Sequence, residues 1–305
     1  MDGQDVQIIN YTEKDCKLLA EKLKDTAVLV LIRERTVIDE NLLKLLPNLK
    51  LISQTGKISN HLNLEDCNKH NIAVAEGIGS PIAPAEMAWA LLMNTIRQIP
   101  QAIEGMKKGQ WQTNIGTTVH GKTIGIWGYG KIGQRMAQYA KVFGAKVVVW
   151  GSDVSRAKAV LDGFEQANSK EAFFKNADII TLHLRLTEKT FEIVKLTDLL
   201  FMKRTSTIIN TSRAELIEKG ALLKCLKLGN PLYAGVDVYE EEPIYDQNFE
   251  LLKMKNVVCT PHLGYVEQNG YELYFEKAFE NVLNYINGHP TNIANPEVLS
   301  QQNTD

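Results

Sequence analysis

The stretch from residue 123 to residue 150 constrains the fold more than any other part of the chain. In order, an apolar run, a glycine-rich turn, an amphipathic segment and a second β-branched run occupy residues 123–127, 128–133, 134–143 and 146–150. This order predicts a strand, a tight turn, a helix and a parallel strand. In α/β folds, that unit carries the pyrophosphate of a dinucleotide.

The turn has the spacing GxGxxG, and each glycine has a physical role in the prediction. Gly128 allows the tight turn, Gly130 lets the backbone approach phosphates, and Gly133 lets the helix pack closely on the sheet. Backbone N–H groups and the positive end of the helix dipole then face the anion. We expect the dinucleotide to be bound by Gly128, Tyr129, Gly130, Lys131, Ile132 and Gly133.

Composition bounds the architecture and excludes several functional classes. With 305 residues, 44% of them hydrophobic, the chain can bury a substantial core, and we expect two domains. A net charge of −2 gives no electrostatic footprint for nucleic acid or an anionic membrane, and no signal or membrane-spanning pattern is present. The scattered cysteines lack ligand spacing, which predicts reduced thiols in a cytoplasmic protein and no metal site.

Short apolar runs alternate with helical patterns along the rest of the chain, which predicts parallel sheets. Strands are expected at 6–9, 27–32, 49–52, 72–75, 179–182, 207–210, 233–236 and 257–259. A long helical pattern at 85–108 should be kinked or split by Pro100, and a helix at 271–286 should cross back to the first domain. We predict a Rossmann-type doubly wound dinucleotide-binding domain, 98–270, and a smaller flavodoxin-like α/β substrate domain, 1–97 and 271–305.

Four further motifs occur in a fixed order: HLRLT at 183–187, NTSRA at 210–214, GVDVYEEEP at 235–243 and TPHLG at 260–264. Together with the glycine turn, they resemble the D-isomer-specific 2-hydroxyacid dehydrogenases, which include phosphoglycerate, glycerate and formate dehydrogenases. The resemblance covers nearly the whole chain. It implies an oxidoreductase that transfers a hydride between a nicotinamide cofactor and C2 of a small D-2-hydroxy acid or 2-oxo acid.

Three side chains fit the chemistry of this reaction. Arg213 offers a planar fork that can hold two substrate oxygens. His262, at a strand end, is the candidate acid/base because imidazole titrates near neutral pH, and Glu242 would accept a hydrogen bond from its other ring nitrogen. In the family, the matching positions act as the substrate arginine, the acid/base histidine and its carboxylate partner.

The resemblance assigns other positions to the cofactor. Asp237 would bond the nicotinamide carboxamide, His183 and Thr211 would line the cofactor, and Gly264 would lie close to the nicotinamide. It also implies a homodimer built through the cofactor domain and an arm at 101–118.

The loop at 54–58 resembles the one whose backbone N–H groups hold the substrate carboxylate in the family. We therefore expect Gly56, Lys57 and Ile58 to bind substrate. Ile58 stands where the family usually has a second glycine, which changes the shape expected for that pocket.

The cofactor's 2′ position is a departure from the family pattern. NAD-binding members end the second strand of the glycine unit with Asp or Glu, whereas this chain has Gly151. Asp153 can serve NAD, while Ser152 with Arg156 can accept the phosphate of NADP, and Ser152 or Asp153 can also simply cap a helix. We expect NAD, with NADP as the alternative.

A second departure concerns the first domain. Compared with the family, the chain starts at a later strand and is short by one strand and helix, so we expect this domain to lack its usual first strand. The alternative function is an NAD(H)-sensing binding protein, similar to the corepressors that share the fold, without significant turnover. Such relatives can keep the same three side chains, so the motifs leave this alternative open.

Overall fold

The computed structural model describes residues 3–32, 36–59 and 61–302. The chain divides into two compact units, Pro81–Val266 and a discontinuous one made of Met1–Ser80 and Glu267–Asp305. Both units contain parallel strands connected by helices, so the predicted α/β class is confirmed. No helix in the described ranges combines the length and apolar character needed to cross a bilayer.

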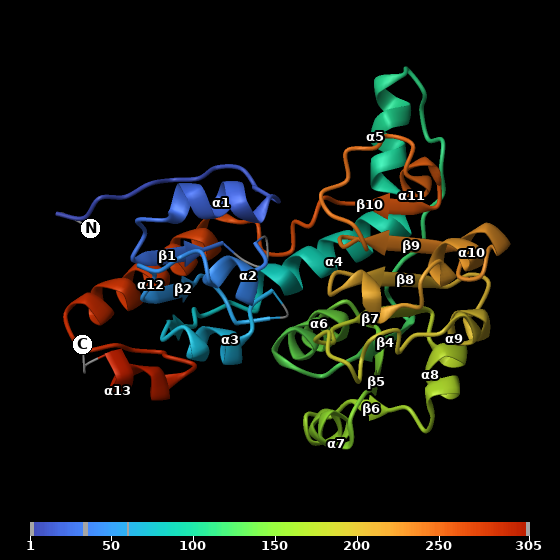
Figure 1. The fold of residues 1–305 in the computed structure, drawn as a ribbon. Coiled ribbons are helices and arrows are strands. Elements are labelled where there is room, and N and C mark those ends of the chain that lie inside the picture. The colour runs from blue at the N-terminus through green and yellow to red at the C-terminus, as the bar shows by residue number, and fades with distance from the viewer. Residues whose placement is uncertain (1–2, 33–35, 60, 303–305) are drawn as a thin grey trace. The chain divides into compact units, whose positions relative to one another are not determined.

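The larger unit is built on a seven-stranded sheet with the order β10-β9-β8-β7-β4-β5-β6, and every pairing is parallel. Figure 1 shows these strands side by side. The strands are β4 (Thr123–Trp127), β5 (Lys146–Trp150), β6 (Glu165–Gln166), β7 (Ile179–Leu182), β8 (Thr207–Asn210), β9 (Tyr233–Val236) and β10 (Val257–Cys259). All except β6 match the predicted ranges, because each is a short apolar run that turns bound on both sides.

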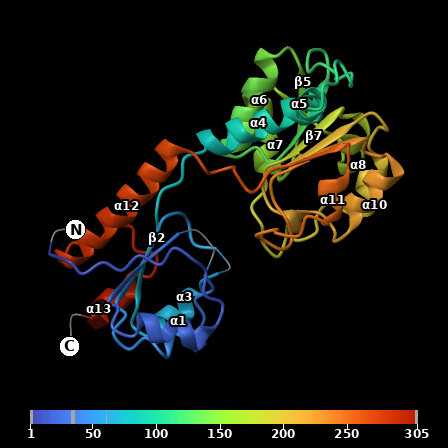
Figure 2. The same ribbon diagram turned by 90° about the horizontal axis from the view of Figure 1, so that it is seen from above.

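Helices cover both faces of this sheet, as Figures 1 and 2 show. One face holds α4 (Ile82–Arg97) and α6 (Lys131–Val142), and the other holds α8 (Lys170–Asn176), α9 (Leu196–Phe201) and α10 (Ala221–Leu228). The remaining helices of the unit are α5 (Ile99–Lys107), α7 (Asp153–Leu161), the 3₁₀ turn η1 (Ala214–Leu216) and α11 (Glu250–Lys253). The doubly wound arrangement is that of a Rossmann-type domain.

The predicted helix at 85–108 is two helices. Gln98 adopts a left-handed conformation with φ 52°, ending α4 and starting α5, and Pro100 lies in the first turn of α5. A proline inside a continuous helix would clash with the carbonyl group four residues earlier, so the first helix ends before Pro100.

The boundaries between the units also differ from the predicted ones, since the structure divides at 80/81 and 266/267 instead of 97/98 and 270/271. The reason is α4, whose buried Leu91, Leu92 and Ile96 join the core of the larger unit.

The smaller unit has a parallel sheet with the order β1-β2-β3, formed by β1 (Val28–Leu31), β2 (Leu51–Gln54) and β3 (Ala73–Ala75). Around it lie α1 (Cys16–Leu23), α2 (Glu40–Leu43), α3 (Leu64–Lys69), α12 (Gln268–Ile286), η2 (Pro296–Val298) and α13 (Leu299–Gln302). Helix α12 completes this unit as expected, because Val282 packs on Leu51 and Ala73 of the sheet. Among the described residues this sheet has three strands, fewer than the five of a flavodoxin-like sheet, as expected for a domain without its usual first strand.

The strand predicted at 6–9 is wrong. These residues form no regular structure; Val6 and Ile8 are 52% and 85% exposed, and Ile9 alone packs against the core. An alternating sequence makes a strand only when a neighbouring strand accepts its backbone hydrogen bonds. Among the described residues, no strand lies beside this segment.

A segment near the C-terminus lies along the outer edge of β3. Ile293 forms an antiparallel bridge with Ala75, and the N–H of Ala294 donates to the carbonyl oxygen of Val74 at 2.8 Å. The buried Asn295 amide accepts from the Val74 N–H at 2.8 Å and donates to the Ile72 carbonyl at 2.9 Å. This polar segment therefore supplies the backbone partners that a further strand would give.

Candidate active site

The glycine turn has the shape that an anion requires. Gly128 has φ +100°, and a Cβ built on it would lie 2.4 Å from the carbonyl oxygen of His183, so only glycine fits. A Cβ on Gly133 would lie 2.0 Å from the carbonyl oxygen of Gly128. The space beside Gly130 is open, and α6 begins there without a side-chain cap. The N–H groups of the first turn of α6, which includes Lys131 and Ile132, therefore fit a cofactor pyrophosphate.

The other predicted cofactor residues follow the ends of the parallel strands. Ser152, His183, Thr211, Asp237 and Gly264 come after β5, β7, β8, β9 and β10 respectively. Because these strands are parallel, their carboxyl ends lie at one edge of the sheet, together with the glycine turn after β4. This is the edge at which doubly wound sheets bind their ligands.

His262 and Glu242, which the sequence pairs, are in contact. Nδ1 of His262 lies 2.6 Å from Oε2 of Glu242, and the other carboxylate oxygen accepts the Tyr239 N–H at 2.9 Å. Burial opposes ionisation of Glu242, but the hydrogen bonds from His262 and Tyr239 and the charges of His262 and Arg213 outweigh it and lower its pKa. An ionised carboxylate at Nδ1 leaves Nε2 as the nitrogen that can exchange a proton with a ligand.

Arg213 belongs to the same neighbourhood, because its charge helps to lower the pKa of Glu242. It follows β8 and immediately precedes η1. Its Nη1 donates to the carbonyl oxygen of Ser212 at 2.7 Å, and the Asn210 amide donates to the Arg213 carbonyl oxygen at 2.8 Å. These bonds hold the backbone from which the guanidinium extends.

Asp237 is fully buried beneath the loop that carries His262. One carboxylate oxygen accepts from the Thr260 hydroxyl at 2.6 Å and from the Leu263 N–H at 2.8 Å, and the other accepts from the Gly264 N–H at 2.8 Å. Burial raises the pKa of Asp237, and these three hydrogen bonds act in the opposite direction. Since His262 has a left-handed φ of 56°, Asp237 ties down the backbone on both sides of a strained residue.

Two cofactor candidates lie beside the glycine turn. The ring of His183 contacts the Thr181 hydroxyl at 2.9 Å, and although part of the residue reaches solvent, desolvation lowers its pKa from 6.5 to about 3. Ser152 caps α7 by accepting the Ser155 N–H at 3.3 Å, and Asp153 is the first residue of that helix. The helix-capping interpretation of Ser152 is therefore correct as local structure.

Gly56, Lys57 and Ile58 belong to the smaller unit, where they follow β2. The Glu76 carboxylate receives the Ile58 N–H at 3.1 Å and the Lys57 ammonium group at 2.6 Å. One N–H group expected to hold a substrate carboxylate is thus already bonded to an acidic side chain.

Three contributors to the site do not stand out in the sequence. The Thr260 hydroxyl donates to the Asp237 carboxylate, and the Tyr239 N–H donates to the Glu242 carboxylate. The Glu76 carboxylate accepts the Ile58 N–H of the loop at 54–58. Thr260 lies inside the TPHLG motif, and Glu76 directly follows the strand predicted at 72–75, so the sequence marks both positions as candidates. A backbone N–H carries no such signal, because every residue except proline has one.

Comparison with known proteins identifies the family to which the chain belongs. Residues 89–264 match the family model of the D-isomer specific 2-hydroxyacid dehydrogenase, NAD binding domain. A glyoxylate reductase of Thermococcus litoralis is 34% identical over 295 residues, which cover 93% of this chain and 88% of that protein.

Solved structures of similar fold carry names from the same class of enzyme. A phosphoglycerate oxidoreductase from Vibrio cholerae has a TM-score of 0.89 and 51% identity, covering 94% of this chain and 92% of that one. A D-lactate dehydrogenase from Aquifex aeolicus, solved with NAD and lactic acid, has a TM-score of 0.77 and 26% identity, covering 88% and 86%. The chain therefore belongs to the D-isomer specific 2-hydroxyacid dehydrogenases, oxidoreductases that work with a nicotinamide cofactor.

Proposed function

We propose that the chain interconverts a small 2-oxo acid and the corresponding D-2-hydroxy acid. The observation that carries this proposal is the contact of 2.6 Å between His262 and Glu242 at the sheet edge that also holds the glycine turn. The names of the relatives support a small acid substrate, and glyoxylate is the first compound to test because it is named in the T. litoralis protein.

Each of the three side chains has a distinct part in the proposed reaction. A reduced nicotinamide bound at the glycine turn would supply the hydride for C2 of the oxo acid. His262 donates a proton from Nε2 to the carbonyl oxygen, and Glu242 stabilises the imidazolium and fixes its orientation. Arg213 binds the substrate oxygens through its guanidinium. In the oxidative direction His262 takes the proton back.

The remaining site residues are proposed by their place in the fold. The unit Pro81–Val266 would bind the cofactor through Gly128–Gly133, His183, Thr211, Asp237 and Gly264. Gly56 and Lys57 of the other unit would bind the substrate carboxylate. Ile58 can take part only if its N–H leaves Glu76, so we propose that this bond breaks when substrate binds.

The test is oxidation of NADH and of NADPH, followed by absorbance, with glyoxylate, hydroxypyruvate and pyruvate. Arg213→Ala should lower kcat/KM by about 10²-fold or more, because a charged contact to substrate oxygens is lost. Arg213→Lys keeps the charge without the planar fork and should recover part of this activity, leaving a loss of about tenfold. Wild-type rates from Arg213→Ala would contradict the proposed substrate contact.

The same assay separates the enzyme from the nucleotide-sensing alternative. Folded protein that binds NADH or NADPH but reduces none of the oxo acids would support the sensor. The names of the relatives, which are a reductase and an oxidoreductase, favour turnover over the sensor.

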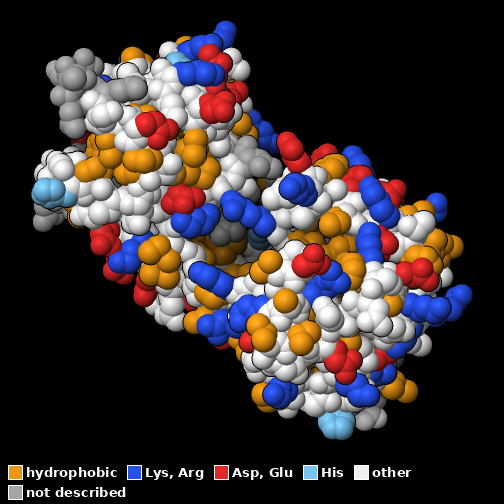
Figure 3. Space-filling model, turned by 90° about the horizontal axis from the view of Figure 1, so that it is seen from below, with side chains coloured by type: hydrophobic (Ala, Val, Ile, Leu, Met, Phe, Trp, Pro, Cys, Tyr) orange, Lys and Arg blue, Asp and Glu red, His pale blue; other side chains and the backbone are white. Residues whose placement is uncertain are grey.

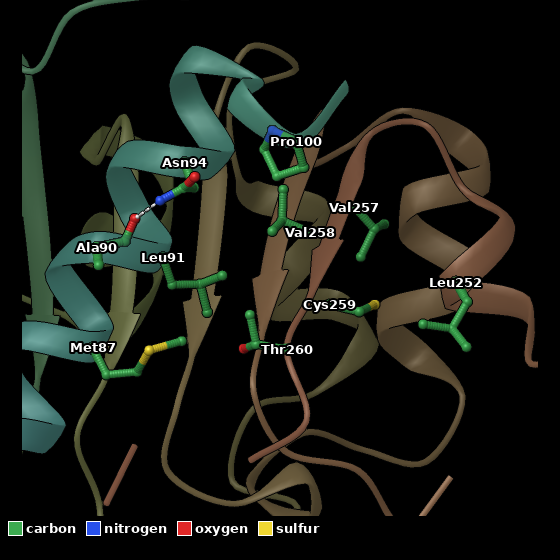
Figure 4. Close-up of a pocket in the computed structure, with 10 residues that line it drawn as sticks. All are labelled: Met87, Ala90, Leu91, Asn94, Pro100, Leu252, Val257, Val258, Cys259 and Thr260. Atoms are coloured by element: carbon green, nitrogen blue, oxygen red, sulfur yellow. Dashed lines mark hydrogen bonds between the residues drawn. The ribbon is translucent and has the colours of Figure 1, made fainter. Parts of the chain in front are cut away.

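We also propose a homodimer that uses the arm at 101–118. Met106, Trp111 and Ile115 are 66%, 76% and 92% exposed, so the arm presents several large apolar side chains to solvent. Beside the base of the arm is a pocket of about 380 Å³ between α4 and the edge strand β10, lined mainly by apolar side chains such as Leu91, Pro100 and Val258 (Figure 4). A second copy of the chain offers apolar arm residues of matching chemistry.

Sedimentation at micromolar concentration tests the dimer. Met106→Glu with Trp111→Glu should give monomer, whereas Leu161→Glu, an exposed apolar residue outside the arm, should leave the dimer intact. Monomeric wild-type protein would contradict the proposal.

On the face in Figure 3, basic and acidic side chains are interspersed, which supports a small-molecule substrate over a nucleic-acid partner. The four cysteines are free thiols, which supports a cytoplasmic location.

A further inference from the structure

The end of β5 lacks the carboxylate that selects NAD in this type of fold. Gly151 stands there, and Asp153 supplies the only carboxylate among residues 150–156. The Asp153 side chain is 92% exposed and is ion-paired with Arg156. A free acid at this position would accept the ribose hydroxyl groups and repel a phosphate. Here the acid is already bound to a cation.

Gly151 lies next to the glycine turn. The Gly128 N–H donates to the carbonyl oxygen of Trp150 at 2.9 Å, and a Cβ on Gly151 would lie 3.7 Å from the Gly128 nitrogen. Under the proposed function this turn holds the pyrophosphate. In a unit of this kind, the adenosine ribose lies at the end of the second strand. The residues after Trp150 therefore surround the ribose 2′ position.

Arg156 is held close to this position. Its guanidinium lies 4.8 Å from the centre of the Trp150 ring, and its side chain is only 24% exposed. Helical side chains lean toward the N-terminus of their helix, which brings Arg156 back over Ser152 and Asp153. Its Nε is buried and has no hydrogen-bond acceptor. The group is thus oriented by an aromatic face and retains a donor to offer.

Two hydroxyl groups lie at the start of the helix that carries Arg156. Ser152 Oγ and Ser155 Oγ lie 3.3 Å apart on the first turn of α7. Hydroxyl groups and a guanidinium are the side chains that bind phosphate oxygens, and arginine does so with paired donors. A phosphate would replace the Asp153 carboxylate as the partner of Arg156, and the displaced carboxylate, whose side chain is 92% exposed, would be hydrated by solvent.

We propose that Arg156, assisted by Ser152 and Ser155, recognises a 2′-phosphate, and that the chain prefers NADP(H) to NAD(H). This inference rests on the proposed function, since it concerns the same cofactor site. It replaces the expectation of NAD drawn from the sequence, in which Asp153 serves the ribose.

Binding distinguishes the two cofactors without turnover. Quenching of protein fluorescence by NADPH and NADH gives the dissociation constant of each for the wild type and three variants. The wild type should bind NADPH at least about tenfold more tightly than NADH, a difference expected for one charged contact. Arg156→Ala should remove most of this difference by weakening NADPH alone. Lys158→Ala, a basic residue of the same helix, should leave both constants within about twofold.

Asp153→Asn separates the two readings of this acid. If Arg156 reads a phosphate, the variant should bind NADPH equally or more tightly and NADH unchanged. If Asp153 serves the ribose, it should bind NADH several-fold more weakly.

A preference of the wild type for NADH, or equal weakening of both cofactors by Arg156→Ala, overturns the inference while the proposed function stands. Failure of the folded protein to bind either cofactor would defeat the proposed function itself, and this inference with it. Circular dichroism confirms that each variant is folded.

Discussion

The hydroxyl group of Tyr129 donates a hydrogen bond of 3.0 Å to the carboxylate of Asp162, joining the glycine turn to the residue that follows α7. The Tyr129 ring is buried and meets Phe164 edge to face. Burial and the carboxylate both raise the pKa of the tyrosine, so the hydroxyl stays protonated and remains a donor. The bond fixes one residue of the turn against a second element.

Tyr129→Phe removes this bond and keeps the ring. We expect the free energy of unfolding to fall by about 0.5–1.5 kcal/mol. Affinity for the cofactor should fall a few-fold because the turn is less firmly held. Urea unfolding and fluorescence titration measure the two effects. Tyr139→Phe is the matched control on α6 and should change stability by less than about 0.5 kcal/mol. Equal effects of the two substitutions would show that the bond to Asp162 is unimportant.

Loss of the Glu242 charge should change the pH dependence of catalysis. Glu242→Gln keeps the side-chain length but leaves the His262 ring without its anionic partner, so kcat/KM should fall. The loss of activity below pH 4.5 that follows protonation of Glu242 should disappear. His262→Ala should lower kcat by about 10²–10⁴-fold. The measurement is kcat/KM across pH for both enzymes, and superimposable profiles would argue against the pair.

The same pair has a consequence for acid stability. The folded-state pKa of Glu242 is lowered from 4.5, so its ionised form stabilises the folded state at neutral pH. This contribution is lost as the pH falls below 4.5 toward the folded-state pKa. Glu242→Gln should therefore unfold with a weaker dependence on pH in this range, as followed by thermal melts.

His183 makes a separate contribution between neutral pH and acid. Its folded-state pKa is depressed from 6.5 to about 3, so the neutral ring stabilises the fold above 6.5 and this stability is lost as the pH falls. Lowering the pH from about 7.5 to about 5.5 should decrease the free energy of unfolding by about 1.4 kcal/mol through one histidine of this kind. Urea unfolding of the wild type and His183→Gln should show this difference in pH dependence. Parallel curves would contradict it.

Asn295 tests the edge of the smaller sheet. Its replacement by alanine leaves the buried N–H of Val74 and the buried carbonyl of Ile72 without their partner. We expect the free energy of unfolding of this unit to fall by about 2–4 kcal/mol, since each unsatisfied buried group costs about 1–3 kcal/mol. The exposed Asn287→Ala should cost less than about 0.5 kcal/mol. A small effect of Asn295→Ala would mean that water replaces the amide.

The sequence predicted the larger sheet well because its strands are short, apolar and bounded by turns. It failed where apolar pattern and structure separate. Strand β6 is an exposed Glu-Gln pair with no apolar signal, and the 291–295 segment pairs with β3 through polar residues. The segment at 6–9 has the pattern without a neighbouring strand. The hydrophobic pattern of a segment indicates which side chains are buried, whereas strand pairing depends on whether another strand lies beside the segment.

The site shows a similar division. The contact of His262 with Glu242 could be expected because both residues lie in motifs that resemble the family, in which the matching positions form a pair. The support that Asp237 gives to the His262 loop could not, since two of its three donors are backbone N–H groups. Likewise, the sequence named Arg156 as a candidate, but only the structure shows its guanidinium over Trp150 and its ion pair with Asp153.

The discontinuous smaller unit has a consequence for synthesis on the ribosome. Ser53 donates to the carbonyl oxygen of Ala278, and Val74 donates to Asn295, so these strands are synthesised before the residues that complete their unit. At about 5–20 residues per second, translation of the intervening unit takes roughly ten seconds or more. During that time, the nascent chain holds an unfinished apolar sheet. Chaperone contact during synthesis should therefore concentrate on residues 28–75.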